Sequence, residues 1–126
     1  MMTRPALEFH KVFRVEFEGP TAIVVPPANP ISFRYNEIHL EANAVIRMID
    51  DPEVKNMVID FTNVDYASSM IIGALIRMAR KVTNHGGQAI MCHANGNMLE
   101  ILTTMNLLKL WPHFDSRELA LASLEE

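Results

Sequence analysis

The sequence lacks most of the features by which a biochemical function is recognised directly. Cys92 is the only cysteine in 126 residues, so an internal disulfide and a paired-cysteine metal site are both excluded. The 11 Lys and Arg are outnumbered by 15 Asp and Glu and form no basic cluster, which argues against nucleic acid or an acidic membrane surface as partner. No apolar run is long enough to cross a bilayer, and the first residues lack the apolar core of a secretory signal. We therefore expect a cytoplasmic protein with no metal and no cofactor, which binds neither nucleic acid nor a membrane.

The composition is typical of a globular protein, with 49% hydrophobic and 21% charged residues. A chain of this length has room for one hydrophobic core, which predicts a single domain over residues 1–126. Residues 1–12 precede the first predicted strand, and we expect them to form a flexible N-terminal segment.

Strand and helix patterns alternate along the chain. A β-hairpin is predicted over residues 13–25 and a Pro-rich loop over residues 26–30. The next predicted elements are a helix over 36–49, a strand over 57–61, a helix over 69–83, a strand over 88–93, a helix from Asn97, a further strand, and a helix over 117–124. Asn97 with Glu100, and Asp115 with Glu118, have the spacing of a capping box. This order predicts an α/β fold, a mixed sheet with about four helices packed on it.

The stretch from Met57 to Val82 is the most informative part of the chain. Its first five residues are short, apolar and partly β-branched, which is typical of a strand buried on both faces. Apolar residues then recur at 71, 74, 75, 78, 79 and 82, the spacing of one helical face. Ser68 or Ser69 can accept a hydrogen bond from an unpaired amide where this helix begins. Asp60 and Asp65, near the strand end, are expected to be a solvated turn residue and a local cap.

Met70, Ile71 and Ile72 form an apolar triplet at the predicted helix start. Three successive helical residues cannot all face one core. We expect at least one of them to be exposed or to be buried by a partner.

The sequence resembles a known family in this region. The order of elements over nearly the whole chain, and residues 57–92 in motif detail, are similar to the STAS domain of bacterial anti-sigma-factor antagonists. Members typically carry an aromatic residue, one further residue, and Asp-Ser-x-Gly-x-Gly-x-Leu, which fall on residues 66–75 (YASSMIIGAL). The phosphorylated serine of the family corresponds to Ser69 and its second Gly to Gly73. The sequence departs from the pattern at Ser68, where the family has Asp, and at Ile71, where it has its first Gly.

The resemblance implies a non-enzymatic protein-binding module that acts by partner switching. In that cycle the unphosphorylated protein binds an anti-sigma-type serine kinase, phosphorylation breaks the complex, and a metal-dependent, PP2C-type phosphatase restores it. Ser69 is the expected phosphorylation site and Ser68 the second candidate. The expected docking surface, with the loop 26–32 at its rim, consists of Asn63, Asp65, Tyr66, Ser68, Ser69, Met70, Ile71 and Ile72.

The physical chemistry of a helix start is compatible with such a switch. A phosphate adds about −1.5 to −2 charges, which the positive end of a helix dipole tolerates. The same charge in a packed interface must be desolvated, so it can weaken binding without changing the fold. The alternative is that the two hydroxyls serve only to cap the helix.

Two other functions remain open. One is a scaffold subunit, such as a homodimer, with no phosphate cycle. The other is a carrier of a lipid or nucleotide in an apolar pocket between sheet and helices. No nucleophile, base and orienting group can be combined from the sequence, so we expect no catalysis.

Overall fold

The computed structural model describes residues 12–28 and 33–124. Its sheet has the strand order β1-β2-β3-β4-β5, in which β1 and β2 are antiparallel and the other neighbours are parallel. The strands are β1 (Arg14–Glu18), β2 (Thr21–Val25), β3 (Asn56–Asp60), β4 (Gln88–Cys92) and β5 (His113–Phe114). The predicted hairpin and the mixed sheet are thus confirmed.

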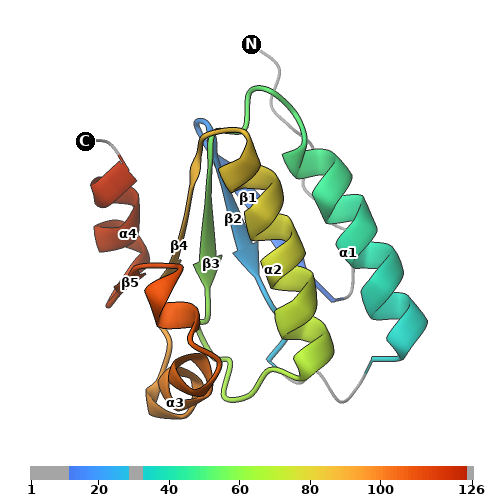
Figure 1. The fold of residues 1–126 in the computed structure, drawn as a ribbon, viewed down its shortest axis with the longest axis vertical. Helices are drawn as coiled ribbons and strands as arrows, with labels where there is room; N and C mark the ends of the chain where they lie inside the picture. Colours follow the sequence, from blue (N-terminus) through green and yellow to red (C-terminus); the bar gives the residue numbers. More distant parts are fainter. Residues whose placement is uncertain (1–11, 29–32, 125–126) are drawn as a thin grey trace.

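The helices lie on both faces of the sheet (Figure 1). They are α1 (Tyr35–Ile49), α2 (Ser69–Asn84), α3 (Gly96–Thr104) and α4 (Arg117–Leu124), with a short 3₁₀ turn at Leu107–Lys109. Helices α1 and α2 run side by side on one face, whereas α4 covers part of the other. Because side chains of a strand alternate between faces, β2, β3 and β4 each serve two separate cores.

The core under α1, α2 and α3 is large. Strand residues Ala22, Val24, Met57, Ile59 and Met91 face this side and are at most 1% exposed. The predicted helical face of α2 is confirmed, since all six of its residues are buried.

The core under α4 is small. It contains Ile23, Val58, Ile90, Cys92 and Ala120, and partly buried residues of α4 pack against it. Ala120 is the only fully buried residue among those of α4. This helix therefore has little apolar area with which to hold its position.

Two predicted helix caps are wrong by one or two residues. Asn95, not Asn97, caps α3, because its side chain accepts a hydrogen bond from the Met98 amide at 2.9 Å. At α4 the Ser116 hydroxyl, rather than the Asp115 carboxylate, accepts from the Leu119 amide at 3.1 Å. In each case a nearby side chain that can also accept a hydrogen bond makes the cap, instead of the residue that has a Glu three positions later.

Helix α2 ends at Asn84 and is followed by a turn that contains two glycines. Gly86 adopts the left-handed conformation (φ 87°) that only glycine enters freely. At Gly87 a Cβ would lie 1.7 Å from the carbonyl oxygen of Lys55, so the absence of a side chain lets this turn pass close to the segment before β3.

The segment before β1 and the loop after β2 are described only in part. Residues 1–11 and 29–32 lie outside the described residues, so the flexibility expected of residues 1–11 stays a prediction, as does the part of the docking-surface rim over residues 29–32. Val12, assigned to the flexible segment, is instead buried, and its amide donates to the Glu41 carboxylate at 2.8 Å. Among the described residues, no helix is long and apolar enough to cross a membrane.

Candidate functional site

The connection from β3 to α2 carries most of the predicted site residues. Buried Val64 and Ala67 fix this connection to the core, so the residues between and around them point outward. Asn63 and Asp65 are exposed, and Tyr66 is 52% exposed. Asn63 has a left-handed backbone (φ 63°), a conformation that Asn tolerates better than most residues. The structure therefore presents these three residues together on one outward loop.

The two serines at the start of α2 have different roles. Ser68 is the N-cap, and its hydroxyl oxygen accepts a hydrogen bond from the Ile71 amide at 3.3 Å. Ser69 is the first helical residue, is exposed, and makes no side-chain hydrogen bond among the residues the structure describes. Of the two serines that could cap the helix, Ser68 is therefore the one that does so. The Ser69 hydroxyl faces the solvent.

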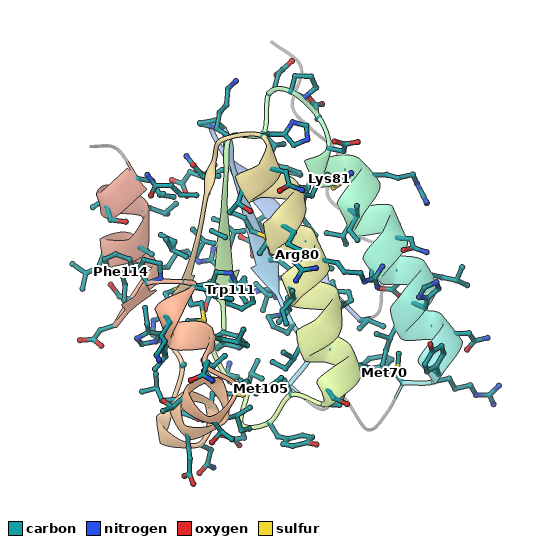
Figure 2. All side chains as sticks on the ribbon, in the orientation of Figure 1. Met70, Arg80, Lys81, Met105, Trp111 and Phe114 are labelled. Atoms are coloured by element: carbon teal, nitrogen blue, oxygen red, sulfur yellow. The ribbon has the colours of Figure 1, made fainter. Side chains whose placement is uncertain are left out.

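The apolar triplet agrees in part with the expectation, because Met70 keeps some exposed surface. Ile71 and Ile72 are both 0% exposed, and Met70 is half-buried against the same core. Met70 lies in the first turn of α2 (Figure 2). The side chains of Ile71 and Ile72 are therefore out of reach of a partner, and the expected docking surface has to be reduced by these two residues.

A groove lies beside the loop, between it and α3. Its cavity volume is about 530 Å³. We call it the Tyr66 groove, and its lining residues are Asp65, Tyr66, Asn97, Glu100, Ile101, Thr104 and Met105. Met105 is 42% exposed, whereas Met98 at the start of α3 is buried. The contribution of α3 was missed because nothing in the sequence links residues 97–105 to residue 66.

One side chain ties the two walls of this groove together. The Asn95 side chain donates a hydrogen bond from Nδ2 to Asp65 Oδ1 while its own Oδ1 caps α3. The loop that leads to Ser69 is therefore held against the start of α3 by the residue that also begins that helix.

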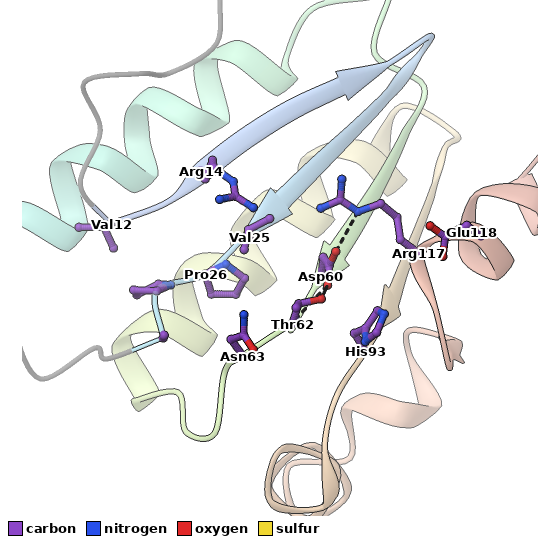
Figure 3. Close-up of a pocket in the computed structure, with 12 residues that line it drawn as sticks. Val12, Arg14, Val25, Pro26, Asp60, Thr62, Asn63, His93, Arg117 and Glu118 are labelled. Atoms are coloured by element: carbon purple, nitrogen blue, oxygen red, sulfur yellow. Dashed lines mark hydrogen bonds and ion pairs between the residues drawn. The ribbon is translucent and has the colours of Figure 1, made fainter.

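A second polar cluster lies at the other face of the sheet (Figure 3). Asp60 is 2% exposed, so the expected solvated turn residue is wrong. Its Oδ1 accepts hydrogen bonds from the Thr62 amide at 2.9 Å and the Thr62 hydroxyl at 2.6 Å, and its Oδ2 accepts from Arg117 Nε at 2.9 Å. Arg117 also donates from Nη1 to Glu16 at 3.1 Å. This arginine thus anchors α4 to two strands.

The charges in this cluster stabilise one another. Burial acts to raise the pKa of Asp60, but the hydrogen bonds from Thr62 and Arg117 outweigh it and hold that pKa below its usual value. Burial acts to lower the pKa of Arg117, but the bonds to Glu16 and Asp60 raise it. Both groups are therefore charged at neutral pH, as a structural ion pair requires.

A cavity of about 560 Å³ opens beside this cluster, at the ends of β2, β3 and β4. Arg14, Asp60, Asn63, His93 and Arg117 are among its lining residues. The predicted ligand pocket was apolar and lay between sheet and helices, whereas this cavity is polar and lies at the strand ends. The lipid-carrier alternative gains no support from it.

Cys92 and His93 do not form a reactive pair. Cys92 is buried in the small core, and burial together with the Asp60 charge raises the pKa of its thiol to about 12. His93 is exposed, with a left-handed backbone (φ 62°). Among the described residues, no group of three or more His, Cys, Asp or Glu side chains could hold a metal ion.

Comparison with solved structures agrees with this architecture. An anti-sigma-factor antagonist (STAS) domain protein from Planctomyces limnophilus superposes with a TM-score of 0.77 at 20% identity, covering 92% of this chain and 100% of that one. The unphosphorylated anti-sigma factor antagonist SpoIIAA gives 0.74 at 12% identity, with 90% and 96% covered. The phosphorylated form of the Bacillus cell fate determinant SpoIIAA gives 0.65 at 14% identity, with 89% and 98% covered. At these identities the likeness establishes the fold.

Sequence comparison identifies the family. No curated protein sequence matches this chain. The family model of the STAS domain, however, matches residues 14–120, which is well over half of the chain. The match extends from β1 into α4 and includes the junction with Ser68 and Ser69. The protein belongs to the STAS domain family.

Proposed function

We propose that this protein is a non-enzymatic, cytoplasmic regulator that binds a partner protein through the start of α2 and releases it when Ser69 is phosphorylated. One observation carries the proposal. Ser69 is exposed at the first position of the helix, while its neighbour Ser68 already makes the cap hydrogen bond. A kinase can therefore modify Ser69 without removing the cap.

The fold should tolerate a phosphate at this position. The first amides of α2 and the positive end of its dipole favour a negative charge there. The helix is held by a row of buried side chains that begins at Ile71, so its position does not depend on Ser69. Phosphorylation is thus expected to change the surface and leave the core intact.

A partner packed over Ser69 would not tolerate the phosphate in the same way. The added charge must be stripped of water inside the interface unless the partner offers a cation. A penalty of about 3 kcal/mol would weaken binding roughly a hundredfold. The surface involved is Asn63, Tyr66, Ser69 and the exposed edge of Met70, with Ser68 beneath it.

The proposed partners are an anti-sigma-type serine kinase and a PP2C-type phosphatase. Two observations support them: membership of the STAS family, and the likeness to SpoIIAA, whose structure is known in unphosphorylated and phosphorylated forms. In this cycle the chain performs no catalysis of its own. The kinase supplies the phosphate and the phosphatase removes it.

The first test is to map phosphopeptides over residues 56–77 in protein purified from its native cells with phosphatases inhibited. We expect phosphate on Ser69, absent from Ser69→Ala and retained in Ser68→Ala. Its absence during both growth and stress would contradict the proposal and favour a scaffold subunit without a phosphate cycle.

The second test separates charge from shape. Proteins bound to the unmodified chain are compared for Ser69→Asp and Ser69→Asn, which are similar in size but differ in charge. Release of the same partner by Asp and its retention by Asn are the expected result. Equal behaviour of the two variants would contradict a switch that acts through charge.

A further inference from the structure

The Tyr66 groove combines exposed apolar surface with unbalanced charge. Tyr66 and Met105 are 52% and 42% exposed, and Ile101 between them is half-buried against the core. Large apolar side chains gathered around one hollow are typical of a binding surface rather than of scattered exposure. Met105 is the residue directly after α3 (Figure 2).

The charges around the groove are all negative. Asp65 and Glu100 line it, and none of its described lining residues is Lys, Arg or His. The Glu100 carboxylate makes no hydrogen bond or ion pair among the residues the structure describes. Asp65 has one oxygen occupied by Asn95 and retains the other. Two carboxylates thus border an apolar floor without a cation of their own.

Two basic residues of the neighbouring helix are directed elsewhere. Arg77 of α2 donates to Asn43 of α1 at 3.2 Å, and Lys81 lies 3.8 Å from Asp50 at the end of α1. These two residues therefore serve the α1–α2 contact rather than the groove.

We propose that the Tyr66 groove binds a segment of the partner protein in which an arginine stands beside an aliphatic side chain. The inference deepens the proposed function, on which it rests, by naming the chemistry of the partner. The guanidinium pairs with the Glu100 carboxylate in a charge-assisted, two-pronged contact and stacks on the exposed Tyr66 ring. The aliphatic side chain covers Ile101 and Met105.

This contact shares Tyr66 with the phosphate-sensitive surface, but it does not include Ser69. Ser69 is not among the lining residues of the groove, and the Tyr66 loop lies between the two. The groove therefore sets which partner is bound, while Ser69 sets whether the complex persists. A phosphate on Ser69 acts where α2 itself is covered, outside the acidic groove.

The test uses synthetic peptides as probes. The full-length, ¹⁵N-labelled protein is titrated with a short peptide of alternating Leu and Arg, and with two matched peptides, Leu with Glu and Ser with Arg. We expect the Leu/Arg peptide to shift amide signals of residues 65–66 and 97–105 and to bind at least about tenfold more tightly than either control peptide.

Two variants with matched controls locate the contact. Glu100→Gln is expected to weaken the Leu/Arg peptide about fivefold to tenfold, while Glu118→Gln, an exposed acid at the start of α4, leaves it unchanged. Met105→Ala is expected to weaken it about fivefold, while Leu110→Ala, which is 66% exposed outside the groove, does not. All four positions are partly or fully exposed, so the variants should fold.

The outcomes separate this inference from the proposed function. No preference for the Leu/Arg peptide, shifts confined to other surfaces, or no binding up to about 2 mM would overturn the groove inference even if Ser69→Asp still releases the partner. Conversely, the peptide result is read on unmodified protein, so it holds if Ser69 is never phosphorylated. Ser69→Asp should leave peptide binding within about twofold, and a larger loss would contradict the separation of the two contacts.

Discussion

Helices α2 and α4 lie on opposite faces of the same sheet and are held there in different ways. Helix α2 has 16 residues, seven of which are buried, and its first residue, Ser69, is exposed and has no side-chain hydrogen bond to any residue of 12–28 and 33–124. Helix α4 has eight residues, one of which is buried, and its first residue, Arg117, is bound to Asp60 and Glu16. A helix anchored by apolar area can leave its first turn available for modification, whereas a helix with little apolar area needs that turn for attachment.

The largest difference in stability between the two helices is expected when an apolar side chain is shortened in each of them. Leu75→Ala, at a fully buried position of α2, is expected to lower the free energy of unfolding by about 3 kcal/mol, because it leaves a cavity in the large core. Leu121→Ala, at a half-buried position of α4, should cost about 1 kcal/mol. Urea denaturation measures both. Equal losses would show that the two helices are anchored alike.

The next largest effect concerns the ion pair of α4. Asp60→Asn is expected to cost about 2 kcal/mol at neutral pH, because it removes the charge that Arg117 faces. The folded-state pKa of Asp60 lies below its unfolded value, so this contribution is complete at neutral pH and is lost as the pH falls through about 4 and below. Denaturation curves of wild type and variant should therefore converge in acid. Glu18→Gln, an exposed acid on β1, is the control and should show no such convergence.

The two serines at the start of α2 are expected to contribute differently to stability. Ser68→Ala is expected to cost about 1 kcal/mol through loss of the cap, and Ser69→Ala less than about 0.5 kcal/mol. Thermal unfolding of both variants is a sufficient measurement. A larger loss at Ser69 would assign the cap to that residue and remove the main support for its modification.

A small effect of the opposite sign is expected at Gly73. A Cβ at this helical position meets no atom within 4 Å, so Gly73→Ala should stabilise α2 by about 0.5 to 1 kcal/mol. Gly87→Ala is the contrasting glycine variant and should be strongly destabilising, because its Cβ would meet the Lys55 carbonyl. Destabilisation by Gly73→Ala would show that other atoms pack against this position of α2.

Local patterns were sufficient to predict most of the fold. The buried strand and the helix from residue 69 follow from short-range periodicity, and both agree with the structure to within a residue. The exposed loop with Tyr66 and the capping role of one of the two serines follow from the same stretch. What failed locally was the choice between nearby caps, as at Asn95 and Asn97, because several side chains can accept the same amide.

Long-range contacts could not be predicted. Arg117 lies 57 residues from Asp60, and no pattern in the sequence pairs them. Asp60 therefore looked like a solvated turn residue, although it is buried. In the same way, the Tyr66 groove exists only because α3 folds back against the loop, 30 residues away, through Asn95 and Asp65. The sequence alone predicts the loop and α3 as separate elements, but it does not predict that the two lie against each other.

The contact between Glu16 and Arg117 spans 101 positions of the chain, and this has a consequence for biosynthesis. The ribosome releases β1 early and α4 late, so all five strands leave it before the residue that joins them to the last helix. Until then Ile23, Val58 and Ile90 have no cover from α4. A nascent chain is thus most exposed to aggregation in the interval after its strands have emerged and before α4 has emerged, and chaperone binding should be concentrated there.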